Sequence, residues 1–173
     1  MNLREFIDKF QRCTSHGWLD WDEAILLVAY AELTEGPIVE VGSYFGRSAM
    51  LLGQLGRRVY CVDPWDDFFS TDMKGEQIYQ RFLANTKGLD VVPVRTKVEL
   101  WQPVLAEFVY LDGDHSYQGT VNQIRAAKAC RPRYVAIHDV AEDGGGAQVR
   151  KAAVDTLGMW KERNGKLAVW ERP

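Results

Sequence analysis

The sequence predicts an α/β fold, a doubly wound, mostly parallel sheet of about seven strands with helices on both faces. Three observations lead to this prediction. From residue 38 onward, short apolar runs typical of buried strands alternate with longer helical patterns. Such alternation builds right-handed βαβ units and hence a parallel sheet. Near the end, two runs flank Asn164-Gly165, a dipeptide typical of hairpins, so we expect an antiparallel hairpin there.

Composition favours one domain that binds neither nucleic acid nor membrane. The chain has 173 residues, 46% of them hydrophobic, and a net charge of −3. It has no basic run for nucleic acid and no apolar run near the roughly 18 residues of a membrane span. Its three cysteines have no metal-binding spacing and its first residues have no secretory signal, which favours a reduced cytoplasmic setting. We expect a single domain over residues 1–173, with a helical cap (1–35) and a sheet core (36–173).

Two helices are expected before the sheet. Apolar residues at helical spacing predict an amphipathic helix over about the first dozen residues. A second helix is expected over about residues 22–33, with Asp20 or Asp22 as its N-cap. Residues 24–31 are apolar nearly all round, which indicates burial against the sheet. Gly36-Pro37 ends this helix and leads into the first strand.

Residues 38–48 are the centre of the prediction. Residues 38–41 form a buried strand, and Gly42 and Gly46 allow a tight turn and the close approach of a ligand. The helix expected over about residues 47–55 directs its free N–H groups and positive dipole end toward that turn. The stretch therefore predicts a cradle for a small molecule.

The remaining elements place polar residues at one edge of the sheet. We expect strands at residues 58–63, 91–95, 107–111 and 134–137, helices at 75–86, 117–130 and 147–157, a capping box at 96–99 that opens a brief helix, a flexible loop at 142–146, and a hairpin of 159–163 with 166–172. In doubly wound sheets the ligand lies at the carboxyl ends of the strands. Those ends carry Gly42, Asp63, Arg95-Thr96, Asp112 and His138-Asp139.

The glycine spacing argues for a nucleoside and against a dinucleotide. The turn reads Gly-x-x-x-Gly, whereas dinucleotide sites use Gly-x-Gly-x-x-Gly to bring the backbone to a pyrophosphate. Asp63 ends the neighbouring strand, where a carboxylate can accept hydrogen bonds from both ribose hydroxyls. A tight turn that binds nothing is the alternative for the glycines, and a strand-ending turn is the alternative for Asp63.

Five ordered motifs resemble class I S-adenosylmethionine (AdoMet)-dependent methyltransferases. They are residues 39–48 (VEVGSYFGRS), 62–65 (VDPW), Phe82 with Asn85, 111–117 (LDGDHSY) and 138–140 (HDV). Within that superfamily the chain is similar to small-molecule O-methyltransferases of the sugar-, macrolide- and catechol-modifying kind, from about residue 17 to the C-terminus. The resemblance implies a seven-stranded Rossmann-like sheet with one antiparallel strand, AdoMet as cofactor and S-adenosylhomocysteine (SAH) as product.

The resemblance also implies roles for individual residues. Glu40, Gly42, Ser43 and Gly46 would line the methionine part of AdoMet, and Tyr44 and Ser48 would also contact the cofactor. Asp63 would hold the ribose with Trp65 beside it, Arg95 and Thr96 would contact adenine, and Asp112 and Gly113 would lie below the sulfonium. For Arg95 a solvated charge, and for Trp65 loop packing, are the alternatives.

The chemistry is expected at three strand-end residues and one histidine. Asp112, His115 and Asp139 are the candidates to take a hydroxyl proton from the acceptor. The resemblance implies a divalent metal at Asp112, His138 and Asp139, where relatives often carry acidic residues. His138 departs from that pattern, and histidine suits Zn, Mn or Fe better than Mg or Ca. The alternative is a metal-free pocket.

We therefore expect O-methylation of a small hydroxylated molecule such as a sugar or natural product. Trp18, Trp21, Trp65, Phe68 and Phe69 could form an apolar lid over it. The chain has no added recognition domain, which favours a small acceptor, although a homodimer could supply a missing wall. Two alternatives are a non-catalytic nucleoside-binding module and, against the glycine spacing, an NAD-type oxidoreductase.

Overall fold

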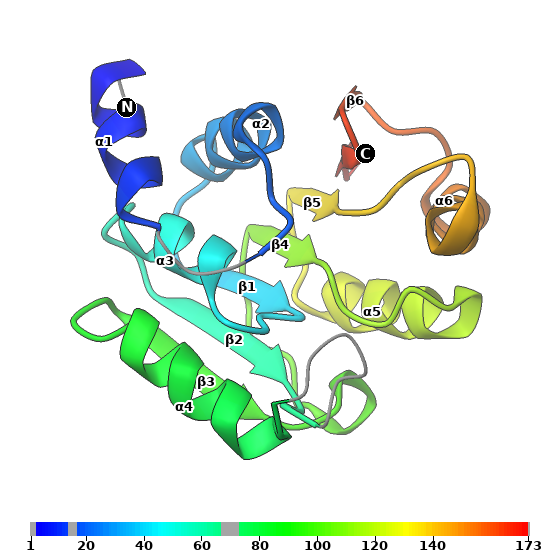
Figure 1. The fold of residues 1–173 in the computed structure, drawn as a ribbon. Coiled ribbons are helices and arrows are strands. Elements are labelled where there is room, and N and C mark those ends of the chain that lie inside the picture. Colours follow the sequence, from blue (N-terminus) through cyan, green and yellow to red (C-terminus); the bar gives the residue numbers. More distant parts are fainter. Residues whose placement is uncertain (1–2, 14–16, 67–72, 173) are drawn as a thin grey trace.

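The computed structural model describes residues 3–13, 17–66 and 73–172, which build one mixed sheet (Figure 1). Within these residues the sheet has seven strands in the order β3-β2-β1-β4-β5-β7-β6. The strands are β1 (Ile38–Val41), β2 (Val59–Asp63), β3 (Val91–Arg95), β4 (Phe108–Leu111), β5 (Tyr134–Ile137), β6 (Glu162–Asn164) and β7 (Leu167–Glu171). β1 to β5 are parallel, and β7 runs antiparallel to β5 and β6. The predicted fold class is confirmed.

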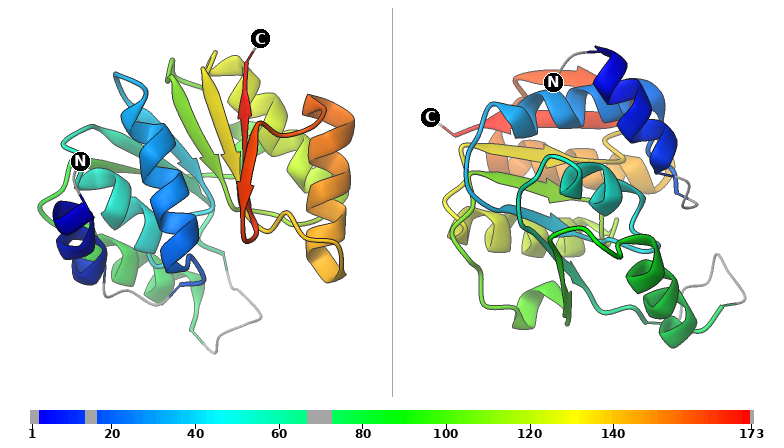
Figure 2. Two further views of the ribbon diagram at one scale, coloured as in Figure 1. Left: turned by 90° about the horizontal axis from the view of Figure 1, so that it is seen from above. Right: turned by 90° about the vertical axis from the view of Figure 1, so that its left-hand side faces the viewer.

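Helices cover both faces of this sheet. They are α1 (Leu3–Arg12), α2 (Trp21–Glu32), α3 (Arg47–Gly53), α4 (Gly75–Asn85), α5 (Tyr117–Ala129) and α6 (Gly144–Leu157), with a 3₁₀ turn η1 (Val98–Leu100). Residues of α1 to α4 share one buried apolar cluster, and residues of α5 and α6 share another. Figures 1 and 2 show α2 and α5 on opposite sides of the strands. No described helix is long and apolar enough to cross a bilayer.

The central strands β1, β4 and β5 are almost entirely apolar because both of their faces are buried. In β1, Ile38 packs into the cluster beneath α1 to α4, whereas Val39 and Val41 pack into the cluster beneath α5 and α6. Successive side chains of a strand point to opposite faces, so a strand covered on both sides needs a continuous apolar run. Glu40 is the exception in β1 and is nevertheless fully buried.

The hairpin forms, but its turn lies one residue later than predicted. Asn164 is the last residue of β6 and pairs with Leu167, so Gly165 and Lys166 make the turn. Gly165 has φ +56°, and a Cβ there would lie 2.8 Å from Oε1 of Glu23. The turn position is thus set by contact with α2, which the Asn-Gly signal does not encode.

Two further local predictions were wrong. Residues 144–146 begin α6 and are not a separate loop. Gly146 permits this because a Cβ there would lie 2.5 Å from Cβ of Ala141, closer than real side chains approach. The capping box at residues 96–99 does not form, because the N-cap is Lys97, which makes no side-chain cap bond, and only a 3₁₀ turn follows. At α2 the first of the two proposed caps, Asp20, is confirmed.

Candidate functional site

A cavity of about 840 Å³ lies at the carboxyl ends of the parallel strands, within the usual size range for a small-molecule site. The backbone ladder continues one residue past each strand and sets the polar residues side by side. Gly42 N–H donates to Val62 O (3.0 Å), Asp112 N–H to Val41 O (2.8 Å), and His138 N–H to Leu111 O (2.9 Å). The cavity lining includes the turn after β1, Asp63, residues 112–116 and His138-Asp139.

Gly42 makes the closest backbone approach in this site. Its φ is +85°, and a Cβ would lie 2.2 Å from the carbonyl oxygen of Asp112. No side chain fits between the β1–α3 turn and the loop after β4, so glycine is required here. Gly46, also at φ +85°, is the N-cap of α3 and packs against Phe82. Both glycines are therefore needed for the turn, whether or not a ligand is bound.

Asp63 holds this turn in place. Its Oδ2 accepts the backbone N–H groups of Ser43 (2.8 Å) and Tyr44 (3.0 Å), and its Oδ1 accepts that of Trp65 (2.6 Å). The carboxylate also lines the cavity. Each carboxylate oxygen has two lone pairs, so these bonds leave acceptor capacity toward the cavity.

Glu40 lies beneath the turn and does not line the cavity. Its Oε2 accepts the Ser43 hydroxyl (2.7 Å) and the Cys61 thiol (3.2 Å). Burial raises the pKa of Glu40 to about 7, against the lowering effect of these hydrogen bonds. Ser43 and Ser48 are buried but line the cavity, and Tyr44 lines it at φ +47°. The contact predicted between Glu40 and the methionine part of AdoMet would therefore pass through Ser43.

Trp65 is part of both the core and the cavity wall. It is 2% exposed, its ring packs against Tyr79 and Phe82, and its Nε1–H donates to Tyr44 O (2.9 Å). Of the proposed lid, Trp18 also lines the cavity and stacks on Tyr44. Trp21 instead packs against Phe6 and Phe10 and is absent from the lining, while Phe68 and Phe69 fall outside the described residues.

Arg95 and Thr96 do not line the cavity. The Arg95 guanidinium is exposed, pairs with Glu76 (Nη1 to Oε2, 2.6 Å) and lies over the Tyr79 ring. Residues 97–99, directly after them, line the cavity instead. After β3 the chain turns into η1, and the cavity lining resumes at Lys97. The structure therefore offers residues 97–99 as the wall where adenine contacts were predicted.

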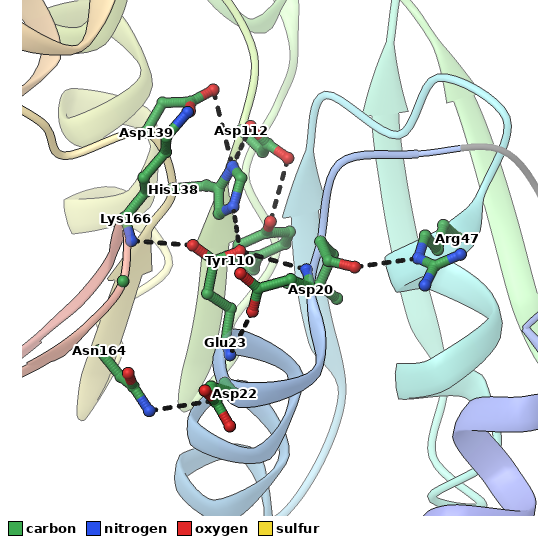
Figure 3. A network of polar contacts seen from close by, with 12 residues as sticks. Asp20, Asp22, Glu23, Arg47, Tyr110, Asp112, His138, Asp139, Asn164 and Lys166 are labelled. Carbon is green, nitrogen blue, oxygen red and sulfur yellow. Dashed lines mark hydrogen bonds and ion pairs between the residues drawn. The ribbon is translucent and has the colours of Figure 1, made fainter.

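The predicted catalytic and metal residues do come together. Asp112, His115, His138 and Asp139 form what we call the strand-end cluster (Asp112, His138 and Asp139 are labelled in Figure 3). Nδ1 of His138 lies 3.3 Å from Oδ1 of Asp112 and 3.6 Å from Oδ2 of Asp139. Nε2 of His115 lies 3.7 Å and 3.4 Å from the same two oxygens. Tyr110 donates its hydroxyl to Oδ2 of Asp112 (3.0 Å).

Opposite charges stabilise one another in the cluster. Burial alone would raise the pKa of Asp112, but the nearby imidazoles of His138 and His115 outweigh it and hold that pKa below its usual value. Contact with His138 lowers the pKa of Asp139 to about 2. Burial opposes the charged form of His138, yet Asp112, Asp139 and Glu23 raise its pKa. Contact with Asp112 raises that of His115.

The donor set fits a divalent cation. One ligand atom from each of Asp112, His138 and Asp139 lies within 4.8 Å of the others. Nδ1 of His138 is buried and makes no well-aligned hydrogen bond, which leaves it available as a ligand once it is deprotonated. Two carboxylates and one imidazole suit Mn, Fe or Zn.

Glu23 is the residue at this site that sequence reasoning missed. It is 3% exposed on α2, and its Oε2 lies 2.9 Å from Nε2 of His138 (Figure 3). A signal was present, because Asp20-x-x-Glu23 is a capping box and Glu23 directly precedes the apolar run 24–31, where burial requires a polar partner. The partner is 115 residues away in the chain and cannot be read from that signal.

Comparisons with known proteins agree with this geometry. A family model described as "Methyltransferase domain" matches residues 39–140. The solved structure of CalS11, described as a TDP-rhamnose 3'-O-methyltransferase of calicheamicin biosynthesis, has 16% identity and a TM-score of 0.61, covering 99% of this chain and 96% of that one. An O-methyltransferase from Bacillus cereus in complex with SAH has 14% identity and a TM-score of 0.63, covering 98% and 90%.

The fold is also shared with an enzyme that has a different kind of acceptor. A ribosomal protein L11 methylase from Lactobacillus delbrueckii subsp. bulgaricus has 14% identity and a TM-score of 0.55, covering 84% of this chain and 73% of that one. The curated proteins gave no significant match. The family match spans more than half of the sequence and the whole sheet topology agrees with it, so the chain belongs to the methyltransferase-domain family with the class I fold.

Proposed function

We propose that this protein transfers a methyl group from AdoMet to a hydroxyl group of a small molecule. One observation carries the proposal, namely that a single cavity is lined by the glycine turn, by Asp63 and by the strand-end cluster. The first two suit a nucleoside and its methionine tail, and the third suits the removal of a proton. Family membership and the O-methyltransferases among the similar structures support it.

The turn and its supports would bind the cofactor. Gly42 lets the turn lie against the loop after β4, and Ser43 and Tyr44 line the cavity. Asp63 keeps one lone pair, on Oδ1, for a ribose hydroxyl. Residues 97–99 would flank the adenine. When bound, AdoMet supplies a methyl carbon made electrophilic by its sulfonium. The protein then has to align the acceptor and exclude water.

The strand-end cluster would deal with the acceptor's proton. Asp112 and Asp139 are held ionised and face the cavity, so they can accept a hydrogen bond from an incoming hydroxyl. His115 is more exposed than His138 and lies at the cavity wall, where its Nε2 can take the proton when it is neutral. Asp112 and His115 both remain candidates for the base. Asp112→Asn and His115→Gln, measured separately, distinguish them.

A divalent cation would be held by Asp112, His138 and Asp139. A bound cation would lower the pKa of the acceptor hydroxyl and bind its oxygens. Its carboxylate neighbours raise the pKa of His138 and favour its imidazolium form, which would stabilise a developing alkoxide and let the cluster work without metal.

The acceptor is proposed to be small. Residues 17–19 and Arg47 close the cavity on the side of the N-terminal helices, and Trp18, 60% exposed, offers an aromatic face that suits a sugar or an aromatic ring. These helices therefore act with the sheet as one domain.

The test is a thermal-shift panel followed by turnover assays. SAH should raise Tm, NAD should not, and Mn²⁺ should raise Tm in a manner reversed by EDTA if the cation is part of the site. Methyl transfer to a panel of sugars and phenols should then yield product. No stabilisation by SAH would overturn the proposal. SAH binding without turnover on any acceptor would favour the nucleoside-binding module.

A further inference from the structure

Glu23 contacts the strand-end cluster from the protein core, on the side away from the cavity. It lies in the first turn of α2, and its carboxylate meets the His138 ring on the side opposite Asp112 and Asp139 (Figure 3). The side chains of Glu23 and His138 are 3% and 2% exposed, and Oε2 to Nε2 is 2.9 Å. This is the most buried ion pair described at the site, and the mechanism proposed above gives it no role.

The hydrogen bonds of Glu23 determine which nitrogen of His138 carries a proton. Oε1 of Glu23 accepts the Lys166 N–H (2.8 Å) and Oε2 accepts the Asp20 N–H (3.2 Å). These two N–H donors stabilise the ionised form of Glu23, and an ionised carboxylate acts as an acceptor only. The third partner, Nε2 of His138, must therefore be an N–H donor. Nδ1 is then the ring nitrogen that faces Asp112 and Asp139.

We propose that Glu23 is a positioning residue for methyl transfer, which keeps a proton on Nε2 of His138 and so presents Nδ1 to Asp112 and Asp139. The inference rests on the proposed function, which assigns the removal of the acceptor's proton to the strand-end cluster. With a proton on Nδ1 as well, the ring carries a positive charge that stabilises the carboxylates of Asp112 and Asp139. Without that proton, its lone pair completes the cation site. Glu23 sets the direction of the ring in both cases, as carboxylates do behind histidine ligands generally.

The same carboxylate ties three segments together. Oε1 of Glu23 holds the β6–β7 turn through the Lys166 N–H, and Lys166 O accepts the N–H of Val140, two residues after His138. Gly165 has no Cβ, which allows the turn to come this close to Glu23. α2 is therefore part of the reaction site rather than a cap over it.

The first experiment reads the protonation of His138 in the unmodified full-length protein. In protein whose histidine ring nitrogens are labelled with ¹⁵N, the NMR chemical shifts distinguish the Nε2–H tautomer, the Nδ1–H tautomer and the imidazolium. We expect Nε2 to be protonated. A neutral ring protonated only on Nδ1 would overturn the inference, with no variant needed.

The second experiment uses Glu23→Gln, which keeps the size of the side chain. Its amide N–H₂ can donate to Nε2, so His138 should change to the Nδ1–H tautomer. On the acceptor that turns over in the panel, kcat should fall about 10- to 100-fold, as is usual when the partner of a ligand histidine is lost. The SAH Kd should stay within about twofold of wild type.

Asp20→Ala is the matched control. It removes the other half of the same capping box and lowers Tm, but leaves the Glu23–His138 contact in place, so kcat and the ¹⁵N pattern should not change. A Glu23→Gln variant with wild-type kcat, or an Asp20→Ala variant with an equal loss, would show a purely structural role. If wild-type protein binds no SAH, the proposed function fails, while the ¹⁵N pattern still decides the orientation of His138.

Discussion

The β1–α3 turn and the strand-end cluster lie in one cavity but are built differently. The turn is a continuous stretch, residues 42–46, held by two glycines, by neighbouring backbone and by the single carboxylate of Asp63. The cluster takes residues from two strand ends and relies on Glu23 of a distant helix. The turn is therefore determined by local geometry, and the cluster by a balance of charges in the core. Variants should affect the two regions through different measurements.

Gly42→Ala should have the largest effect on the turn. A Cβ placed 2.2 Å from the carbonyl oxygen of Asp112, at φ +85°, forces the turn away from the loop after β4. Backbone strain and overpacking should together reduce the free energy of unfolding by about 4 kcal/mol. Denaturant unfolding measures this, and SAH binding should be lost.

The matched control for Gly42 is Gly88→Ala. Gly88 has the same φ of +85°, but nothing lies within 4 Å of its Cβ position. Gly88→Ala should lower the free energy of unfolding by only about 1 kcal/mol, which is the strain of the left-handed conformation. Equal losses of unfolding free energy in Gly42→Ala and Gly88→Ala would show that the close backbone approach at Gly42 does not contribute to stability.

Glu40 should make the turn sensitive to pH. Its pKa is about 7 in the folded protein and near 4.5 when unfolded, so the folded state binds the extra proton between these values. Stability from this group is therefore greatest at low pH, falls as pH rises through that window, and is lost above about pH 7. The difference is about 3 kcal/mol. Tm measured against pH should decline less steeply in Glu40→Gln than in wild type, and parallel curves would contradict the assignment.

Asp112→Asn should affect the cluster and spare the turn. It removes one of the two charges that face His138 and His115, while the backbone contact with Gly42 remains. We expect kcat to fall at least about 100-fold, in the range found for lost acid–base groups. The SAH Kd, measured by calorimetry, should change by less than about threefold. A large loss of SAH affinity with normal kcat would reverse the roles assigned to the two regions.

Arg95→Ala should have the smallest effect. The guanidinium is exposed and pairs with Glu76, and such surface pairs contribute about 0–1 kcal/mol. SAH affinity should match wild type, whereas Lys97→Ala, two residues later and in the cavity lining, should weaken it. Weaker SAH binding in Arg95→Ala would support the adenine contact that the resemblance to class I methyltransferases implied.

The methyltransferase prediction from the five motifs is confirmed by the family match. The residues of the site could be found from the sequence for a geometric reason. Parallel strands end at one edge of the sheet, so residues placed just after buried apolar runs must gather there. Asp112 and His138-Asp139 were found in this way, 26 residues apart in the chain (138 − 112). The predicted individual contacts with cofactor and metal remain predictions.

The sequence by itself determined where the strands lie along the chain, the glycine turn and the edge of the sheet at which the site forms. These depend on apolar runs and on backbone freedom, which are properties of short segments. Only the tertiary structure decided that Asp63 supports the turn, that Arg95 points away from the cavity and that Glu23 directs His138. Each of these depends on a contact between side chains or backbone groups far apart in the chain, and such contacts leave no local pattern to read.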